Sequence, residues 1–194
     1  SYTTDWLTDK AIDYIRINKK EKFAVMVSYP DPHQPWECRE PYNSMYSPDN
    51  MSVPVSFVHH DEAINSWHDS IIRKHYKNLS PERISRIKAV YSGSVNARRL
   101  IDELKSFDLY DNTLVVFTSD HGEYMGEHGM LYKNQLFETA HRLPMIIRLS
   151  GEEKGTVNSG VFSMVDFTPG ILSLMNIYPD VDFEGRDFSI ILDK

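Results

Sequence analysis

Residues 113–151 read TLVVFTSDHGEYMGEHGMLYKNQLFETAHRLPMIIRLSG and contain the pattern that decides the fold. The stretch opens with an apolar run of β-forming residues at 113–118, which predicts a buried strand. Ser119-Asp120-His121-Gly122 follows directly at the carboxyl end of that strand. Ligands bind at this edge in open α/β sheets, and Gly122 permits the backbone to turn there. The stretch therefore predicts a sheet edge that presents a carboxylate and an imidazole to one cleft.

Asp120 and His121 are candidate metal ligands. Aspartate is a hard oxygen ligand, and histidine binds a transition metal or donates a hydrogen bond to an anionic oxygen beside calcium. The same residues also fit a plainer interpretation, in which Asp120 caps the next helix and His121 is a surface residue. Taken alone, the short motif favours that plainer interpretation.

The rest of the chain predicts alternating strands and helices. Residues 23–29 (FAVMVSY) and 143–149 (LPMIIRL) are apolar runs that predict two further strands, and 159–165 is a fourth candidate. Helices are expected at residues 4–19, at 80–107 after a Ser80-Pro81 start, and around 169–175. A proline-rich loop is expected over 30–54, with short helices or loop over 55–79. This order predicts an α/β fold with a mostly parallel sheet flanked by helices.

Composition limits the classes of partner. The chain has 194 residues, 41% hydrophobic and 25% charged, with a formal net charge of −7. This charge argues against nucleic acid and anionic membranes as partners, because both bind to surfaces with clustered lysine and arginine. No apolar stretch approaches the roughly 20 residues of a membrane-spanning helix. The single cysteine, Cys38, excludes an intrachain disulfide framework.

The long stretch resembles, nearly position for position, the sulfatases and the related phosphonate and phosphate monoester hydrolases of the alkaline phosphatase superfamily. The shared elements are the strand into Ser-Asp-His-Gly, then GEHG at 126–129, Lys133, and Arg-Leu-Pro at 142–144. Upstream, VSYPDPHQPW at 27–36 is similar to the segment that places a histidine over the substrate in these enzymes. The resemblance extends over residues 6–185.

The resemblance implies a role for four residues. Asp120 stands at a metal-ligand position and His121 where the family has asparagine or histidine as a second ligand. The implied metal is calcium in a sulfatase, and manganese or zinc among the phosphate-ester relatives. Lys133 matches the lysine that contacts the transferred sulfuryl or phosphoryl oxygens, and His33 the histidine near the leaving-group oxygen. Without the family context, Lys133 reads as a solvated lysine and His33 as packing against Trp36.

Two parts of the family's site have no counterpart in this sequence. Sulfatases form their nucleophile, formylglycine, within Cys/Ser-x-Pro-x-Arg, and they complete the metal site with an early Asp-Asp pair. Cys38 is followed by Arg39-Glu40-Pro41, which does not fit that motif. We therefore expect residues 1–194 to be one partial domain, the C-terminal portion of a catalytic domain. The isolated chain is expected to be inactive and to self-associate through its incomplete sheet.

For the complete enzyme the resemblance implies hydrolysis of sulfate esters, including those of sugars. Two alternatives stay open: a phosphonate or phosphate monoester hydrolase, and a non-catalytic relative that binds anionic glycans. By analogy with the family, a periplasmic or secreted location is favoured. His128 is not assigned a role, and the group His59, His60, Asp61 and Glu62 is interpreted as a solvated loop.

Overall fold

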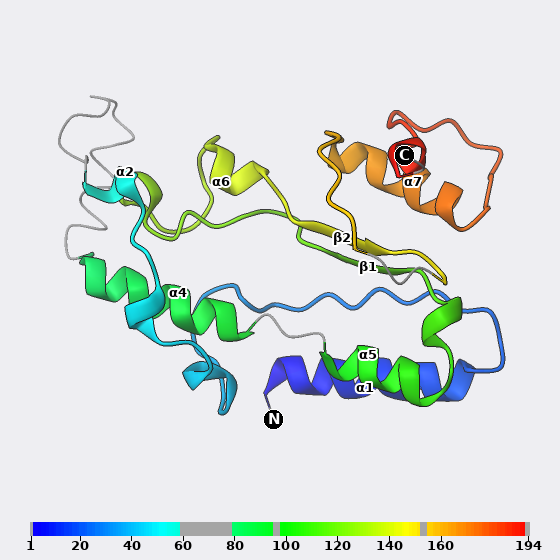
Figure 1. Cartoon of the computed structure of the whole chain (residues 1–194), viewed down its shortest axis with the longest axis horizontal. Helices are drawn as coiled ribbons and strands as arrows, with labels where there is room; N and C mark the ends of the chain where they lie inside the picture. The colour runs from blue at the N-terminus through cyan, green and yellow to red at the C-terminus, as the bar shows by residue number, and fades with distance from the viewer. Residues whose placement is uncertain (1, 59–78, 95–97, 152–154, 193–194) are drawn as a thin grey trace. The chain divides into compact units, whose positions relative to one another are not determined.

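The computed structural model describes residues 2–58, 79–94, 98–151 and 155–192 (Figure 1). The group His59, His60, Asp61 and Glu62 lies outside the described residues. The chain divides into two compact units. The first unit comprises Ser1–Phe107 and Thr118–Pro144, and the second comprises Asp108–Phe117 and Met145–Lys194. No helix in the described part of the chain is long and apolar enough to cross a membrane.

The first helix of the first unit is α1 (Thr3–Asn18), as the sequence predicts. Its buried side chains, at about one helical turn apart, are Thr8, Ala11, Ile12 and Ile15. The helix α5 (Arg98–Ser106) lies alongside it (Figure 1). Both helices are amphipathic, so each buries an apolar face against its neighbour.

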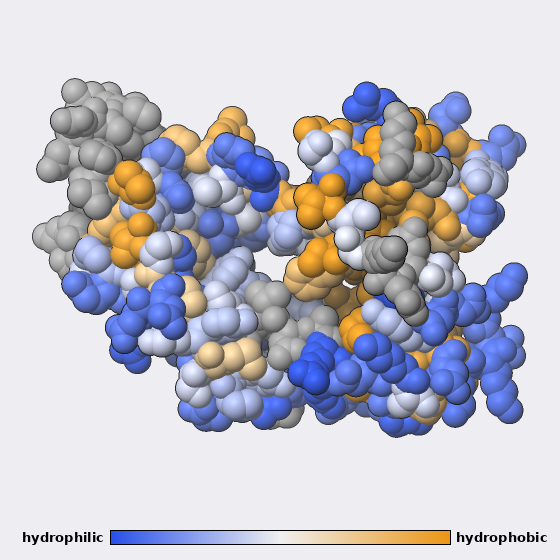
Figure 2. All heavy atoms as spheres, in the orientation of Figure 1, coloured by the Kyte–Doolittle hydropathy of each residue, from blue (hydrophilic) through white to orange (hydrophobic). Residues whose placement is uncertain are grey.

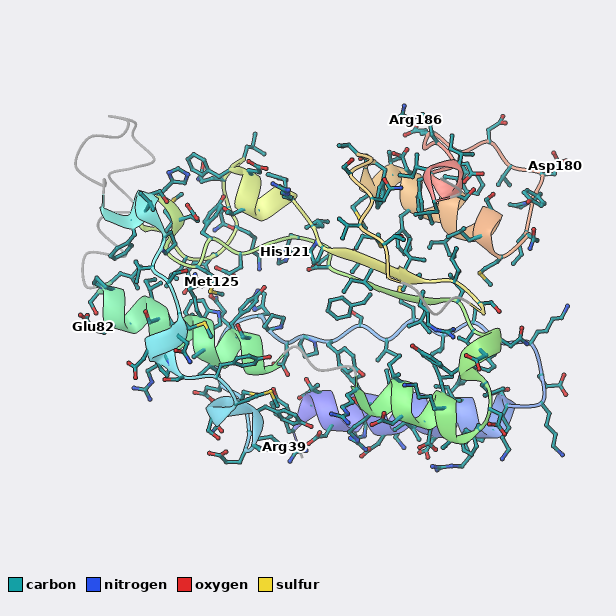
Figure 3. The ribbon with its side chains drawn as sticks, in the orientation of Figure 1. Arg39, Glu82, His121, Met125, Asp180 and Arg186 are labelled. Carbon is teal, nitrogen blue, oxygen red and sulfur yellow. The ribbon has the colours of Figure 1, made fainter. Side chains whose placement is uncertain are left out.

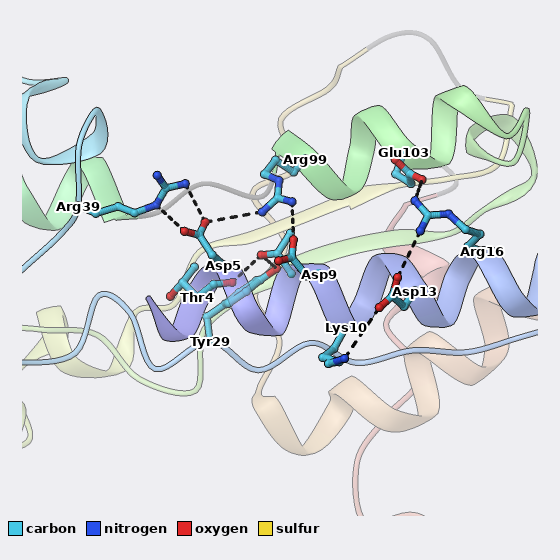
Figure 4. A network of polar contacts seen from close by, with 11 residues as sticks. Thr4, Asp5, Asp9, Lys10, Asp13, Arg16, Tyr29, Arg39, Arg99 and Glu103 are labelled. Atoms are coloured by element: carbon cyan, nitrogen blue, oxygen red, sulfur yellow. Dashed lines mark hydrogen bonds and ion pairs between the residues drawn. The ribbon is translucent and has the colours of Figure 1, made fainter. Parts of the chain in front are cut away.

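Ion pairs connect α1 to α5 at their polar edges (Figure 4). The Arg99 guanidinium lies 2.5 Å from Asp9 Oδ1 and 3.6 Å from Asp5 Oδ1. Arg16 lies 3.0 Å from Glu103 Oε1 at the other end of the pair of helices. Partly exposed ion pairs of this kind contribute about 0–1 kcal/mol each. They therefore align the two helices more than they stabilise them.

The helix α4 (Pro81–Ser94) begins at the predicted Ser80-Pro81 start. The Ser80 hydroxyl accepts a hydrogen bond from the Arg83 N–H at 3.3 Å, which is a normal N-cap contact. The one helix predicted over 80–107 is described as two, α4 and α5, with residues 95–97 outside the description.

A small core joins α4 to the segment that follows the first strand. Ile84 and Ile87 of α4 are buried against Met125 and Leu131. Burial of a side chain of this size contributes about 1.5–3 kcal/mol. This cluster fixes the segment of residues 119–133, which contains the candidate ligands, against α4.

The short helices and strands complete the description. In the first unit α2 (Val55–Val58) and α6 (Glu138–His141) are single turns. Short 3₁₀ turns of the first unit are η1 (Tyr42–Ser44), η2 (Pro48–Asn50) and η4 (Glu127–Gly129). The second unit contains η3 (Tyr110–Asn112), η5 (Met164–Asp166), α7 (Phe167–Leu174) and η6 (Ser189–Ile191).

The described sheet has two strands, β1 (Val115–Thr118) and β2 (Met145–Arg148), which pair with each other. Both lie where the sequence predicts strands. Arg148 at the end of β2 places its guanidinium 3.7 Å from the Tyr110 ring centroid and 2.7 Å from Asp111 Oδ1. A larger sheet and its parallel order stay predictions.

Two strand predictions are wrong in the described structure. Residues 23–29 are extended but belong to no strand, and Met26 is 90% exposed. Residues 159–163 are irregular, and residues 164 and 165 belong to η5. Apolar side chains also lie on the surface of the second unit (Figure 2), where Val157 and Val161 are almost fully exposed. An apolar run forms a strand only where a second strand supplies hydrogen bonds, and the described residues supply none to either segment.

The helix α7 begins at a buried carboxylate. Asp166 accepts hydrogen bonds from the Ser163 N–H at 2.8 Å and from the Arg186 N–H at 2.7 Å. These two N–H groups lower the pKa of Asp166 below its ordinary value of 3.8. The carboxylate thus links the segment before α7 to the chain around Arg186, which Figure 3 labels.

We expect Asp166→Asn to reduce the dependence of stability on acid pH. A carboxylate whose pKa is lowered by folding contributes stability that is complete above its unfolded pKa, near 3.8, and that is lost as the pH falls through its lower folded pKa. The variant should therefore have a lower Tm at pH 7 and a smaller fall in Tm below pH about 4. Thermal unfolding from pH 2 to 7 measures this, with Asp180→Asn, an exposed position, as the control. Equal acid sensitivity in the Asp166 variant and the parent chain would contradict the assignment.

Candidate functional site

The segment after β1 is held in place by its own backbone. The Gly122 N–H donates to the Ala140 carbonyl at 2.8 Å, and the Tyr124 N–H donates to the Tyr132 carbonyl at 2.9 Å. Gly126 closes the loop by donating to Met130 at 2.8 Å, with a φ of +95° that favours glycine. The loop returns the chain so that Tyr132 and the residues that follow it lie beside the residues after β1.

Gly122 is required by close packing. A Cβ at this position would lie 1.9 Å from the Thr139 carbonyl oxygen, which is a backbone atom. Gly122→Ala is therefore expected to lower the free energy of unfolding by about 1–3 kcal/mol. Urea unfolding measures the change, and Gly155→Ala is the matched control, because a Cβ there meets nothing within 4 Å. A Gly122 variant as stable as the control would contradict this packing.

Asp120 and His121 face each other directly after β1, in the segment where Figure 3 labels His121. Asp120 Oδ2 lies 3.6 Å from His121 Nε2. His121 Nδ1 lies 2.9 Å from the Gly122 carbonyl oxygen. A carbonyl only accepts, so Nδ1 donates, and a neutral His121 presents the lone pair of Nε2 to the carboxylate. In this arrangement both Oδ2 and Nε2 can accept a hydrogen bond or ligate a cation.

The geometry of this pair fits a bound cation. Nitrogen and oxygen ligands at about 2.1 Å from one tetrahedral metal ion lie about 3.4 Å apart. The observed separation of Oδ2 and Nε2 is 3.6 Å, and the side chain of Asp120 is 85% exposed and open to a ligand. The described part of the chain contains no group of three histidine, cysteine, aspartate or glutamate side chains able to hold a metal. That Asp120 and His121 are metal ligands therefore stays a prediction.

His33 lies in the proline-rich segment of the first unit. Its Nδ1 lies 2.9 Å from the Gln34 carbonyl oxygen, so Nδ1 again donates and Nε2 is the nitrogen free to act on a ligand. The ring is exposed. The backbone N–H of His33 donates to the Pro30 carbonyl at 2.9 Å. His33 and His121 are thus oriented in the same way, because Nδ1 of each ring donates to the backbone carbonyl of the next residue.

Glu123 brings the predicted residues together. Its half-buried carboxylate accepts a hydrogen bond from the Tyr132 N–H. Burial raises the pKa of Glu123, and this hydrogen bond and electrostatic interactions with Lys133, His33 and His121 act in the opposite direction. One carboxylate therefore lies within electrostatic reach of three of the four predicted residues.

The fourth predicted residue, Asp120, acts electrostatically on the phenol of Tyr91. Burial raises the pKa of this α4 phenol, and the negative charges of Glu123 and Asp120 raise it further. Asp120 and Glu123 therefore both lie within electrostatic reach of Tyr91. The four predicted residues come from segments separated by up to 100 positions in the sequence, and all four belong to the first unit.

Sequence reasoning missed Glu123 and Tyr91. Glu123 directly follows the Asp-His-Gly motif. A carboxylate two residues from the predicted ligand His121, at the predicted cleft, could have indicated it. Tyr91 was assigned to the apolar face of a helix, because periodicity treats a tyrosine as an apolar residue. Its hydroxyl becomes visible only when the neighbouring segment is placed.

His128, to which the sequence assigned no role, is engaged in packing. Its ring stacks on Phe137 with centroids 4.1 Å apart, and its backbone N–H donates to the Ser56 hydroxyl at 3.1 Å. Its backbone φ of 52° is a left-handed value. These contacts explain His128 as part of the loop's structure.

Curated proteins that resemble the chain are sulfatases and their relatives. The multifunctional alkaline phosphatase superfamily protein PehA of Trinickia caryophylli is 26% identical, over 86% of this chain and 37% of its own length. An arylsulfatase of Clostridium perfringens is also 26% identical, over 100% of this chain and 42% of its own length. The chain thus spans about two fifths of the length of these relatives.

Solved structures agree with the relatives. The phosphonate monoester hydrolase of Silicibacter pomeroyi superposes with a TM-score of 0.73 at 26% identity, over 95% of this chain and 41% of that structure. A protein solved with its substrate D-glucosamine-2-N,6-O-disulfate superposes with a TM-score of 0.77 at 21% identity, over 100% of this chain and 52% of that structure. The second likeness concerns the fold alone. Together they support the predicted alkaline phosphatase/sulfatase-like α/β fold.

A family model described as sulfatase matches residues 1–177. This match includes the first unit, most of the second unit and all four predicted site residues. The chain therefore belongs to the sulfatase family.

Proposed function

We propose that this chain is the C-terminal part of the catalytic domain of a metal-dependent sulfatase that hydrolyses sulfate esters, including those of sugars. The observation that carries the proposal is the pair Asp120 and His121 directly after β1, with Oδ2 and Nε2 3.6 Å apart, within the part of the chain that the sulfatase family model matches. A cation site, a fixed lysine and an oriented histidine are what displacement at a sulfuryl group requires. "Complete enzyme" below means this chain together with the segment that supplies the nucleophile.

Asp120 and His121 would hold the metal, through Oδ2 and Nε2. Calcium is the cation that suits a carboxylate site of the family, and when bound it neutralises charge on the ester and on the nucleophile. Other ligands, including the family's Asp-Asp pair, would come from the nucleophile-bearing segment. The Gly122 carbonyl keeps His121 in the tautomer that offers Nε2.

Lys133 and His33 would act on the substrate itself. The Lys133 ammonium is a compact positive charge that can neutralise the equatorial oxygens of the transferred group. His33, when protonated, can donate from Nε2 to the departing alcohol oxygen while Nδ1 stays bound to the Gln34 carbonyl. The tautomer and orientation of His33 are therefore fixed before the substrate binds.

The formylglycine nucleophile is the family's, and it would lie in the segment upstream of this chain. Its motif, Cys/Ser-x-Pro-x-Arg, does not occur among the 194 residues. The single partial domain predicted for residues 1–194 is supported by one family model that runs through both compact units.

A second candidate function is hydrolysis of phosphonate or phosphate monoesters. The likeness to a phosphonate monoester hydrolase at 26% identity favours it, and the same cation, lysine and histidine would serve phosphoryl transfer. The named sulfatases among the relatives favour sulfate. A non-catalytic anion- or glycan-binding relative is the third candidate, and retention of all four residues in one place speaks against it.

The test is a substrate comparison with the complete enzyme. We expect hydrolysis of 4-nitrophenyl sulfate and of glucosamine 6-sulfate to exceed hydrolysis of 4-nitrophenyl phosphate and phenyl phosphonate esters. Removal of the metal with a chelator should abolish turnover, and calcium should restore it. The isolated 194-residue chain is expected to be inactive in the same assays. Preference for the phosphorus esters would overturn the sulfatase assignment, and no turnover of any ester would favour the binding protein.

A further inference from the structure

A hollow of about 910 Å³ opens beside His33 on the first unit. We call it the α4 hollow, since one wall is the exposed side of α4. The opposite wall is the proline-rich segment that begins at His33 and ends at Glu37. Tyr132, the residue before Lys133, completes the lining. The hollow thus adjoins His33, the histidine that we place at the leaving-group oxygen.

Two arginines give the α4 hollow a positive wall. Arg83 and Arg86 lie three residues apart on α4, hence on one face of the helix. Both are exposed, and neither makes an ion pair within 4.0 Å in the described part of the chain. The arginines that do make such pairs are Arg16, Arg39, Arg98, Arg99, Arg142 and Arg148.

Unpaired arginines are notable in a chain with a net charge of −7. The lining contains one carboxylate, Glu37, so positive charge still predominates there. Guanidinium groups bind sulfate and carboxylate oxygens through paired N–H donors. Glu37 is suited to accept hydrogen bonds from hydroxyl groups. These groups together match a ligand that has both anionic and hydroxyl groups.

Two aromatic side chains, Trp36 and Tyr132, also line the hollow. The rings of Trp36 and Tyr132 are stacked, with centroids 5.7 Å apart and planes at 16°. The backbone of Tyr132 is held by a hydrogen bond from its N–H to the Glu123 carboxylate. Sites for small organic ligands combine such apolar ring surface with a few placed polar groups, in cavities of about 300–1,000 Å³.

We propose that the α4 hollow binds the alcohol part of the substrate, and that this part is a saccharide with a second anionic group held by Arg83 and Arg86. The inference rests on the proposed sulfatase function, because it uses the position of His33 to identify the leaving-group side. The second anionic group is a sulfate or a uronic carboxylate. The complete enzyme is therefore selective for polyanionic sugar sulfates over esters with one charge.

The test compares three substrates with three forms of the complete enzyme. The substrates are a sugar 6-sulfate and the same sugar with a second sulfate, and a third with a uronic carboxylate distinguishes the two anions. The unmodified enzyme should prefer the substrates with two charges. The double variant Arg83→Gln/Arg86→Gln should reduce that preference about 10- to 100-fold, mainly through KM, because the contact is made equally in the ground and transition states. Arg98→Gln, an exposed arginine of α5, is the control and should keep the preference.

The possible outcomes separate this inference from the proposed function. If the unmodified enzyme hydrolyses no sulfate ester, the sulfatase assignment itself is wrong. If it hydrolyses both sugar sulfates without preferring the second charge, or if the double variant keeps the preference, the assignment of the α4 hollow is overturned. Thermal unfolding of the double variant should match that of the unmodified enzyme, because both side chains are exposed.

Discussion

Replacement of Asp120 by alanine is expected to lower kcat/KM for sulfate esters at least about 1,000-fold in the complete enzyme. The side chain would supply an oxygen ligand to the metal, and His121 alone cannot retain a calcium ion. Loss of the ion removes the positive charge that stabilises the transition state. Loss of a residue that only orients a ligand costs about 10- to 100-fold, so loss of the ligand itself should cost more.

The Asp120 variant has a second readout that does not depend on turnover. Calcium binding, measured by isothermal titration calorimetry, should be lost together with activity. Asp13→Asn, at an exposed position on α1, is the control and should keep both. An Asp120→Ala enzyme with unchanged turnover would show that this carboxylate is not a metal ligand.

Lys133→Met is expected to lower kcat for sulfate esters about 100- to 1,000-fold. The ammonium would neutralise charge that develops on the transferred oxygens, and methionine keeps the length of the side chain but not the charge. Lys133→Arg should restore little activity, because the guanidinium is a planar fork and not a compact charge. Lys20→Met, an exposed position, is the control.

The same variant should change the environment of Glu123. The Lys133 charge lowers the pKa of Glu123 against the effect of burial, so its removal should move that pKa further upward. Carboxyl-carbon NMR titration measures the shift. A Lys133 variant with normal kcat and an unchanged Glu123 pKa would mean that Lys133 is a solvated lysine outside the site.

The helices and the paired strands could be predicted because their signals are local. Ser80 and Pro81 mark the start of α4, and the apolar periodicity of residues 4–19 marks α1. The strands β1 and β2 are continuous apolar runs that find each other as partners. In each case the residues that determine the element lie within it.

The segment at residues 23–29 could not be predicted in the same way. Its composition is as strand-like as that of β1, but a strand also depends on a partner that the segment itself does not contain. Without a partner in the described chain, it stays extended and exposes Met26. The composition of this segment permits a strand, and whether the strand forms depends on a hydrogen-bonding partner from another part of the fold.

The four candidate site residues stay predictions, and their neighbours Glu123 and Tyr91 were not predicted as part of the site. The resemblance to the family identified Asp120, His121, Lys133 and His33 through motifs. Glu123 and Tyr91 have no motif of their own and act through burial and neighbouring charge. Such residues follow from the packing of α4 against the segment after β1, which Ile84 and Met125 maintain and which no short stretch of sequence specifies.

The most direct test of the account is a crystal structure of the complete enzyme soaked with Mn²⁺, with an anomalous difference map at the manganese edge. Manganese accepts the same oxygen and nitrogen ligands as calcium and gives a clear anomalous signal. We predict one peak at about 2.0–2.6 Å from both Asp120 Oδ2 and His121 Nε2. A peak at other residues, with Asp120 and His121 left without metal, would contradict the central claim.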